Sequence, residues 1–112
     1  MQTFPHEIEY YRTAEGAAPF KEWLEALRDV NGRAKIRVRL DRARLGNLGD
    51  HKQLAAGLWE MRIDYGPGYR VYFTREGGRL ILLLIGGDKD TQKRDIARAA
   101  GYLEEYQRRH QL

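Results

Sequence analysis

Cysteine is absent from this 112-residue sequence. Without cysteine the chain can form no disulfide framework, no thiol nucleophile and no zinc site with sulfur ligands. Its three histidines, His6, His51 and His110, are far apart and lack the spacing of a metal site. We therefore expect neither thiol chemistry nor a metal site, and we predict no cofactor.

Long hydrophobic runs are also missing. The longest, Leu80 to Ile85, is six residues, whereas a membrane-spanning helix needs about 20. The first residues show neither the basic start nor the apolar stretch of a signal peptide. With 42% hydrophobic and 32% charged residues, the composition is that of a globular protein. We expect a soluble, cytoplasmic chain folded as one domain over residues 1–112.

Positive charge is concentrated in the middle of the chain. Residues 33–75 carry ten basic and four acidic residues, whereas residues 1–32 carry three basic and six acidic ones. Such a patch attracts polyanions, and nucleic acid is the commonest polyanion in a cell. A solvated basic surface without a partner is the alternative.

The spacing of apolar residues predicts the first elements. A strand is expected over Phe4–Tyr11. A helix then begins at Pro19, where a missing amide donor costs nothing, and ends at Asn31-Gly32. The segment Arg33–Leu45 fits both a strand and one face of a helix. Its good helix formers and the stop signal at Gly46 favour a helix, packed antiparallel to the first one.

From residue 58 onward the pattern is that of a β-sheet. Residues 58–64 and 69–75 alternate between apolar and polar, with reversals at Gly66-Pro67-Gly68 and Gly77-Gly78. The apolar run at 80–85 predicts a central strand covered by a helix. A last helix is expected over Thr91–Arg109, with Asp90 or Thr91 as its N-cap. The predicted order is β-α-α-β-β-β-α, an α+β fold whose small, curved, mainly antiparallel sheet carries an N-terminal helical hairpin and a C-terminal helix.

The polar face of the predicted 58–75 hairpin holds candidate binding residues. Alternation places Arg62 and Arg70 on neighbouring strands with their side chains away from the core, and Tyr72 on the same face. Two guanidinium groups beside a tyrosine can hold a phosphate, because each guanidinium binds two phosphate oxygens at once. Cross-strand pairing with Glu60 and Asp64 on a solvated surface is the alternative.

Loops at strand ends supply three more candidates. His51 and Lys52 precede the hairpin, and Lys89 follows the central strand. Such loops commonly carry binding residues. Exposed lysines without a specific role are the alternative.

Several segments of the chain, taken in order, are similar to one family of bacterial proteins. They are Phe20-x-x-Trp23-Leu24-x-x-Leu27-Arg28-Asp29, Arg39-Leu40, Gly46-Asn47-Leu48-Gly49-Asp50 with Lys52, Leu58-Trp59-Glu60-Met61-Arg62-Ile63, Gly66-Pro67-Gly68-Tyr69-Arg70-Val71-Tyr72-Phe73, and Leu82-Leu83-Leu84-x-Gly86-Gly87-Asp88-Lys89-x-x-Gln92-x-x-Asp95-Ile96. The chain resembles the RelE/ParE toxin superfamily, in the phage-derived, HigB-like branch of addiction-module killer proteins.

That resemblance implies a RelE-like fold and a ribosome-dependent, metal-independent endoribonuclease that cuts messenger RNA and inhibits translation. The reaction removes a proton from a ribose 2′-OH, stabilises the charge of the phosphorane and protonates the leaving 5′-oxygen. The resemblance assigns Arg70 and Arg62 to the phosphate and Lys52 and Lys89 as further cations. His51, or a lysine of lowered pKa, is the implied proton carrier.

The expected partners follow from the same resemblance. It implies a toxin that is monomeric when free and that forms a hetero-oligomer with a helix-turn-helix antitoxin. We expect the antitoxin to bind the acidic first helix through Glu22, Glu25 and Asp29, the alternatives being a plugged active site or a merely solvated helix. We also predict a ribosomal RNA contact for the basic residues Arg33, Lys35, Arg37, Arg39 and Arg44.

Two other functions stay open from the residues alone. A ParE-like poison of DNA gyrase would share the fold and would need neither Arg70 nor a proton carrier. A non-catalytic RNA-binding module would use the basic segment Arg33–Arg44. The convergence of cations and a tyrosine on one face favours the ribonuclease.

Overall fold

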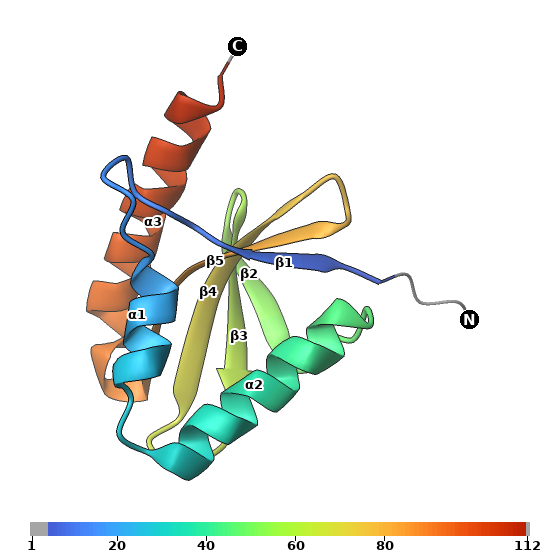
Figure 1. Cartoon of the computed structure of the whole chain (residues 1–112), viewed down its shortest axis with the longest axis vertical. Helices are drawn as coiled ribbons and strands as arrows, with labels where there is room; N and C mark the ends of the chain where they lie inside the picture. The colour runs from blue at the N-terminus through green and yellow to red at the C-terminus, as the bar shows by residue number, and fades with distance from the viewer. Residues whose placement is uncertain (1–4, 112) are drawn as a thin grey trace.

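The structure is a computed structural model that describes residues 5–111. Phe4, with which the first predicted strand begins, lies outside the described residues. The elements, in chain order, are β1 (Glu7–Tyr10), α1 (Pro19–Ala26), α2 (Val30–Arg44), β2 (His51–Ala55), β3 (Leu58–Ile63), β4 (Tyr69–Glu76), β5 (Leu80–Asp88), the 3-10 turn η1 (Lys89–Thr91) and α3 (Gln92–Arg109) (Figure 1).

The five strands form one mixed sheet in the order β1-β5-β4-β3-β2. β1 runs parallel to β5, and the three other pairs are antiparallel. The predicted α+β class and the mainly antiparallel sheet are therefore confirmed. The reversals at Gly66-Pro67-Gly68 and Gly77-Gly78 join β3 to β4 and β4 to β5, and the apolar run at 80–85 lies in an inner strand, as predicted.

Helices cover both faces of the sheet. Residues of α1 and α2, among them Phe20, Leu24, Ile36 and Leu40, pack on the face that carries Val71 and alternate residues of the neighbouring strands. α3 packs on the opposite face through a separate cluster. We call these the α2 face and the α3 face. Within residues 5–111, no helix is both long and apolar enough to cross a membrane.

The boundary between the first two helices differs from the prediction. α1 ends at Ala26, and Asn31-Gly32 lies inside the first turn of α2 instead of ending α1. Asp29 caps α2, because its Oδ1 accepts a hydrogen bond of 3.0 Å from the backbone N–H of Gly32. The segment that was ambiguous in sequence is helical, as predicted. The predicted antiparallel packing of these two helices against each other is wrong. α1 packs against β5 and β1, whereas α2 lies across the sheet and contacts β1 and β3 (Figure 1).

The strand β2 was not predicted. Its residues His51 and Lys52 therefore lie in an edge strand, not in a loop. The start of α3 also differs in detail: Thr91 occupies the N-cap position, but its side chain makes no cap bond there. The capping carboxylate is that of Asp88, which accepts from the backbone N–H groups of Asp90 and Thr91 at the start of η1.

The polar face of the hairpin is not wholly exposed. Glu60, Tyr72 and Thr74 were expected to face solvent, yet all three are buried on the α3 face. The reason is that α3 lies across this face and packs Ala99 and Leu103 against it. At the end of the hairpin nearest the Gly66-Pro67-Gly68 turn, Arg62 and Arg70 of the same face are only half-buried.

Candidate functional site

Two arginines face each other where the hairpin leaves the cover of α3. Arg62 of β3 pairs directly with Arg70 of β4, and like charges at opposite positions of neighbouring strands repel each other. Arg62 Nε donates to Glu60 Oε1 at 2.9 Å. Arg70 Nη1 donates to the carbonyls of Gly68 and Tyr69 at 3.0 and 3.1 Å. Within residues 5–111, Arg62 Nη1 and Nη2 and Arg70 Nη2 form no hydrogen bond, so they can bind an anion.

These guanidinium groups line a cleft of about 330 Å³. Lys89, the first residue of η1, supplies a third cation to it. The turn passes between Arg70 and Lys89 at Gly68, which has a φ of +81° and whose added Cβ would lie 3.3 Å from Arg70 Nη1. Glycine adopts such a φ without strain. The lining residues are Asp50, Arg62, Asp64, Gly66, Pro67, Gly68, Arg70 and Lys89.

A buried carboxylate supports the cleft from below. Glu60 is fully buried, and its two oxygens accept hydrogen bonds from Arg62 Nε at 2.9 Å and Gln92 Nε2 at 2.6 Å. Burial opposes ionisation, but these bonds and the charges of Arg62 and Arg70 outweigh it and lower the pKa of Glu60 below its ordinary value. Glu60 is therefore ionised at neutral pH. It fixes Arg62 in place and ties α3 to the sheet through Gln92.

The segment Gly86-Gly87-Asp88-Lys89 has a structural explanation. A Cβ on Gly86 would lie 2.3 Å from the Trp23 ring, and one on Gly87 would lie 1.8 Å from Asp95 Oδ2. The two glycines thus let α1 and α3 approach the end of β5 from opposite faces. Asp88 then caps η1. Of the four residues, only Lys89 contributes a side chain to the cleft.

Tyr72 lies behind the cleft, not in it. Its side chain is fully buried, and its hydroxyl has no hydrogen-bond partner within residues 5–111. Burial, followed by the charges of Glu60 and Asp95, raises the pKa of Tyr72 above its ordinary value; the Glu60 carboxylate lies near the hydroxyl, but no bond of normal geometry joins them. The hydroxyl is therefore protonated at neutral pH and does not reach the surface on which a phosphate would bind.

The two candidates on β2 separate onto different faces. Lys52 pairs with Glu60 and so shares the α3 face with the arginines, but it does not line the cleft. His51 pairs with Met61 on the α2 face, where its ring lies 5.8 Å from the ring of Trp59. His51 is thus not brought together with the arginines. The structure gives no geometric support to its predicted role as proton carrier.

The basic residues of α2 do not form one surface. Arg39 points toward the sheet, where its guanidinium donates to the carbonyls of Arg62, Leu48 and Asp50. Burial lowers its pKa, and its contacts hold the loop before β2 against β3. Arg33 donates to Leu27 O at 2.6 Å. The structure thus uses two of the five predicted RNA-binding residues for internal contacts, and leaves Lys35, Arg37 and Arg44 exposed.

The predicted acidic surface of the first helix is largely engaged in local contacts. Glu22 Oε2 accepts from the backbone N–H of Ala18 at 2.8 Å, and Glu25 lies 3.8 Å from Lys21. Asp29 caps α2 and also accepts the hydroxyl of Tyr69 at 2.7 Å. The backbone bond from Gly32 and then the Tyr69 bond lower the pKa of Asp29.

Four residues of the site were not predicted to act there. Glu60 and Asp64 were identified only as surface partners of the arginines, and their place on the same alternating face was the available signal. Gln92 and Asp50 come together with the arginines only through tertiary contacts. No cluster of three or more histidine or carboxylate side chains suited to a metal ion occurs within residues 5–111.

Comparison with known proteins adds a family to this geometry. Residues 22–103, which include α2, Arg62, Arg70 and Lys89, match a family described as "Phage derived protein Gp49-like". A protein of Haemophilus influenzae, named only as an uncharacterized protein, is 48% identical over 80 residues. Those residues are 71% of this chain and 81% of that protein.

Proposed function

The chain belongs to the Gp49-like family of phage-derived proteins, and from that premise we propose that it is the toxin of a toxin–antitoxin module. We propose further that it is an endoribonuclease that cuts messenger RNA on the ribosome. The observation that carries this proposal is the pair of opposed arginines, Arg62 and Arg70, with Lys89 across the same cleft.

The arginine pair suits a phosphodiester that becomes a phosphorane. The bond to Glu60 stabilises the charge of Arg62 and raises its pKa, and the free Nη atoms of both guanidinium groups can still donate to an anion bound between the two strands. A phosphorane carries more negative charge than the diester, and fixed cations stabilise the more highly charged species more strongly. The bond from Arg62 to Glu60 and the bonds from Arg70 to Gly68 and Tyr69 hold both groups in place.

Proton transfer is assigned to two titratable groups of the cleft, Asp64 and Lys89. The ribose 2′-oxygen attacks the phosphorus while its proton passes to the carboxylate of Asp64, which is exposed in the cleft lining. The bond from phosphorus to the 5′-oxygen breaks, and Lys89 gives its proton to that oxygen. The products are a 2′,3′-cyclic phosphate and a 5′-hydroxyl. Glu60 is not used as the base, because both of its oxygens are bonded and it is buried.

Induced expression in bacteria tests the proposal. Growth should stop, and primer extension on abundant transcripts should find discrete breaks within translated codons. The Arg70→Ala variant should cause neither effect at the same protein level. Growth arrest with DNA breaks that depend on gyrase, and with intact transcripts, would instead support a gyrase poison.

A further inference from the structure

α2 carries apolar side chains on two sides. Ile36 and Leu40 face the sheet and are buried. On the other side, Val30 and Val38, with Leu45 directly after the helix, are 64%, 47% and 69% exposed. Exposed apolar side chains that gather on one side of a helix can mark an interaction surface. Within residues 5–111, nothing covers the outer side of α2.

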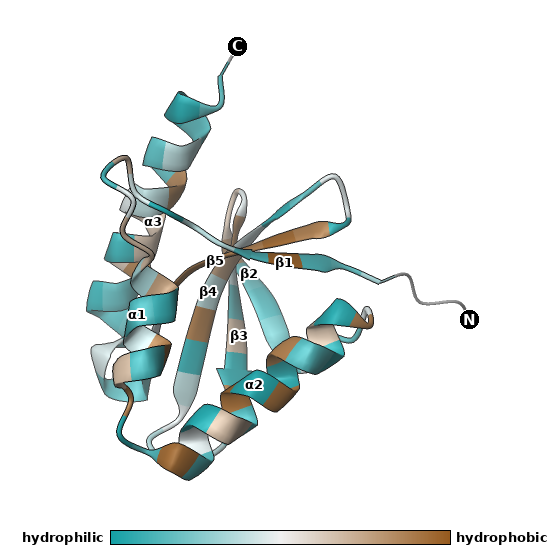
Figure 2. Cartoon of the chain, viewed as in Figure 1, coloured by the Kyte–Doolittle hydropathy of each residue, from teal (hydrophilic) through white to brown (hydrophobic). Residues whose placement is uncertain are grey.

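The outer apolar residues lie on one side of α2, with the exposed Asp41 among them. At 100° per residue, Val30, Ala34, Val38 and Leu45 fall within a sector of about 80°, and Asp41 falls in the same sector between Val38 and Leu45. Ala34 is exposed as well, and Figure 2 shows hydrophobic positions at intervals along α2. The stripe is about 22 Å long, which is the length of about four turns of a second helix. We call these four residues the outer stripe.

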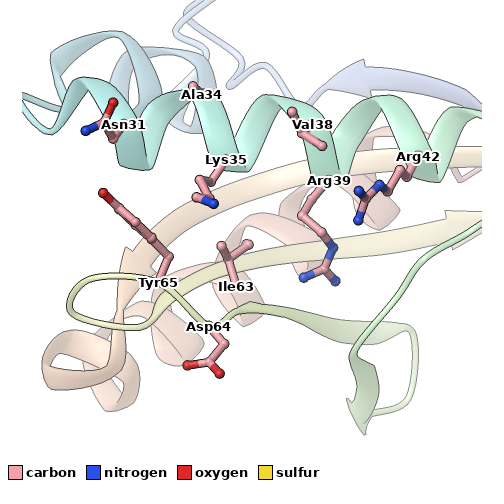
Figure 3. Close-up of a pocket in the computed structure, with 9 residues that line it drawn as sticks. All are labelled: Asn31, Ala34, Lys35, Val38, Arg39, Arg42, Ile63, Asp64 and Tyr65. Carbon is pink, nitrogen blue, oxygen red and sulfur yellow. The ribbon is translucent and has the colours of Figure 1, made fainter.

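A groove of about 600 Å³ runs along one edge of the outer stripe, between α2 and the end of β3. Figure 3 shows Lys35, Arg39 and Arg42 extending from α2 toward the segment that carries Ile63 and Tyr65. Arg39 is bonded to backbone carbonyls. Lys35 and Arg42 have no carboxylate within 4.0 Å among residues 5–111, and they are two helical turns apart.

The opposite edge of the stripe is also basic. Arg37 is exposed there and, within the described residues, forms no ion pair. Arg44 lies on this edge too, but it is paired with Asp41 at 2.7 Å. The stripe is therefore flanked by unpaired positive charge on both sides. Asp41 lies within it and is paired with Arg44, and Asp64 lines the groove.

We infer that the outer side of α2 binds an amphipathic helix of a partner protein. Its apolar side would cover the outer stripe, and carboxylates about two turns apart would pair with Lys35 and Arg42. The inference rests on the proposed function, in which the partner is the antitoxin. RNA would use the cations but leave the stripe exposed to water, so the stripe favours a protein. Asp64 lines both the groove and the cleft, so the bound helix lies beside the proposed site.

The test uses the whole chain and, as the probe, the protein encoded next to it in its genome. Isothermal titration should give a complex with the wild-type chain. Ala34→Glu should weaken it about tenfold or more, because a charge then faces an apolar and acidic partner surface. The matched control is Ala97→Glu, an exposed alanine of α3, which should leave the affinity unchanged. Lys35→Glu with Arg42→Glu should weaken the complex further.

The outcomes separate this inference from the proposed function. Ala34→Glu should still arrest growth when expressed alone, but the probe protein should no longer rescue that arrest. If the wild type, Ala34→Glu and Ala97→Glu all bind the probe protein with equal affinity, the inference is overturned, even if growth arrest and messenger cleavage are found. The Lys35→Glu, Arg42→Glu double variant could also bind polyuridine RNA more weakly than the wild type while binding the probe protein equally well. That result would assign α2 to RNA and would overturn the inference. Failure of the wild-type chain to arrest growth refutes the proposed function, and the titration then decides the surface alone.

Discussion

Replacing Tyr72 by phenylalanine separates a structural role of this residue from a chemical one. The side chain is fully buried on the α3 face, and its hydroxyl has no hydrogen-bond partner among the described residues. In the unfolded chain that hydroxyl bonds to water. A buried polar group that loses its partner costs about 1–3 kcal/mol, so Tyr72→Phe should raise the free energy of unfolding by about 1 kcal/mol.

Urea unfolding measures this effect. Trp23 and Trp59 are partly buried against the core, so their fluorescence follows the loss of packing. A gain of about 1 kcal/mol corresponds to a rise of roughly 4 °C in the melting temperature of a domain of this size. Growth arrest should be unchanged, because the hydroxyl does not reach the cleft.

Tyr69→Phe is the matched control on the same strand. The Tyr69 side chain is also buried, but its hydroxyl donates to Asp29 Oδ2 at 2.7 Å. The same chemical change therefore removes an existing bond to a carboxylate and should destabilise the fold. The two variants are thus expected to shift stability in opposite directions. A Tyr72→Phe variant less stable than the wild type would refute the reasoning, because the hydroxyl would then have a partner such as Glu60. A stable variant that no longer arrests growth would show that the hydroxyl takes part in the chemistry.

Two further substitutions test the supports of the site. Since the pKa of Glu60 is lowered by folding, its stabilising contribution is complete above the unfolded value of about 4.3 and is lost as the pH falls through the folded value. In urea titrations at decreasing pH, the Glu60→Gln variant should therefore lose less free energy of unfolding than the wild type. Equal losses in the two proteins would contradict this. Arg39→Met removes the bonds to the carbonyls of Leu48 and Asp50 and should lower the free energy of unfolding by about 1–3 kcal/mol. Lys35→Met should change it little, and equal loss in both would contradict a supporting role for Arg39.

The strand order near the hairpin was accessible from the sequence because the pattern there is strong. Alternation over residues 58–75, a glycine-rich reversal and an apolar run at 80–85 each indicate one structure, and all three are found. The same alternation placed Arg62 and Arg70 on one face, whereas their direct cross-strand pairing is seen only in the register of β3 and β4. β2 was missed because His51–Ala55 is short, polar and at the sheet edge, so it lacks any alternating signal.

The errors came from contacts between distant segments. Asn31-Gly32 resembles a helix stop, but Asp29 caps α2 there and Gly32 lies close to Asp29 and Tyr69. The alternating pattern predicts exposed side chains for Glu60 and Tyr72, because no feature of the neighbouring sequence shows that α3 covers their face. The side of the sheet on which His51 lies depends on the register of β2 against β3, which the sequence does not specify.

Cleavage of messenger RNA by the purified chain on translating ribosomes tests the central claim most directly. The wild-type chain should cut within codons and leave 2′,3′-cyclic phosphate ends. Arg70→Ala should cut about 10²–10³ times more slowly, as is typical when one fixed group that stabilises a transition state is removed. The matched control, Arg75→Ala, lies on the same strand but contacts the Trp59 ring on the α2 face, and it should cut at the wild-type rate. Intact messenger RNA with the wild-type chain, or equal cleavage by all three proteins, would contradict the account.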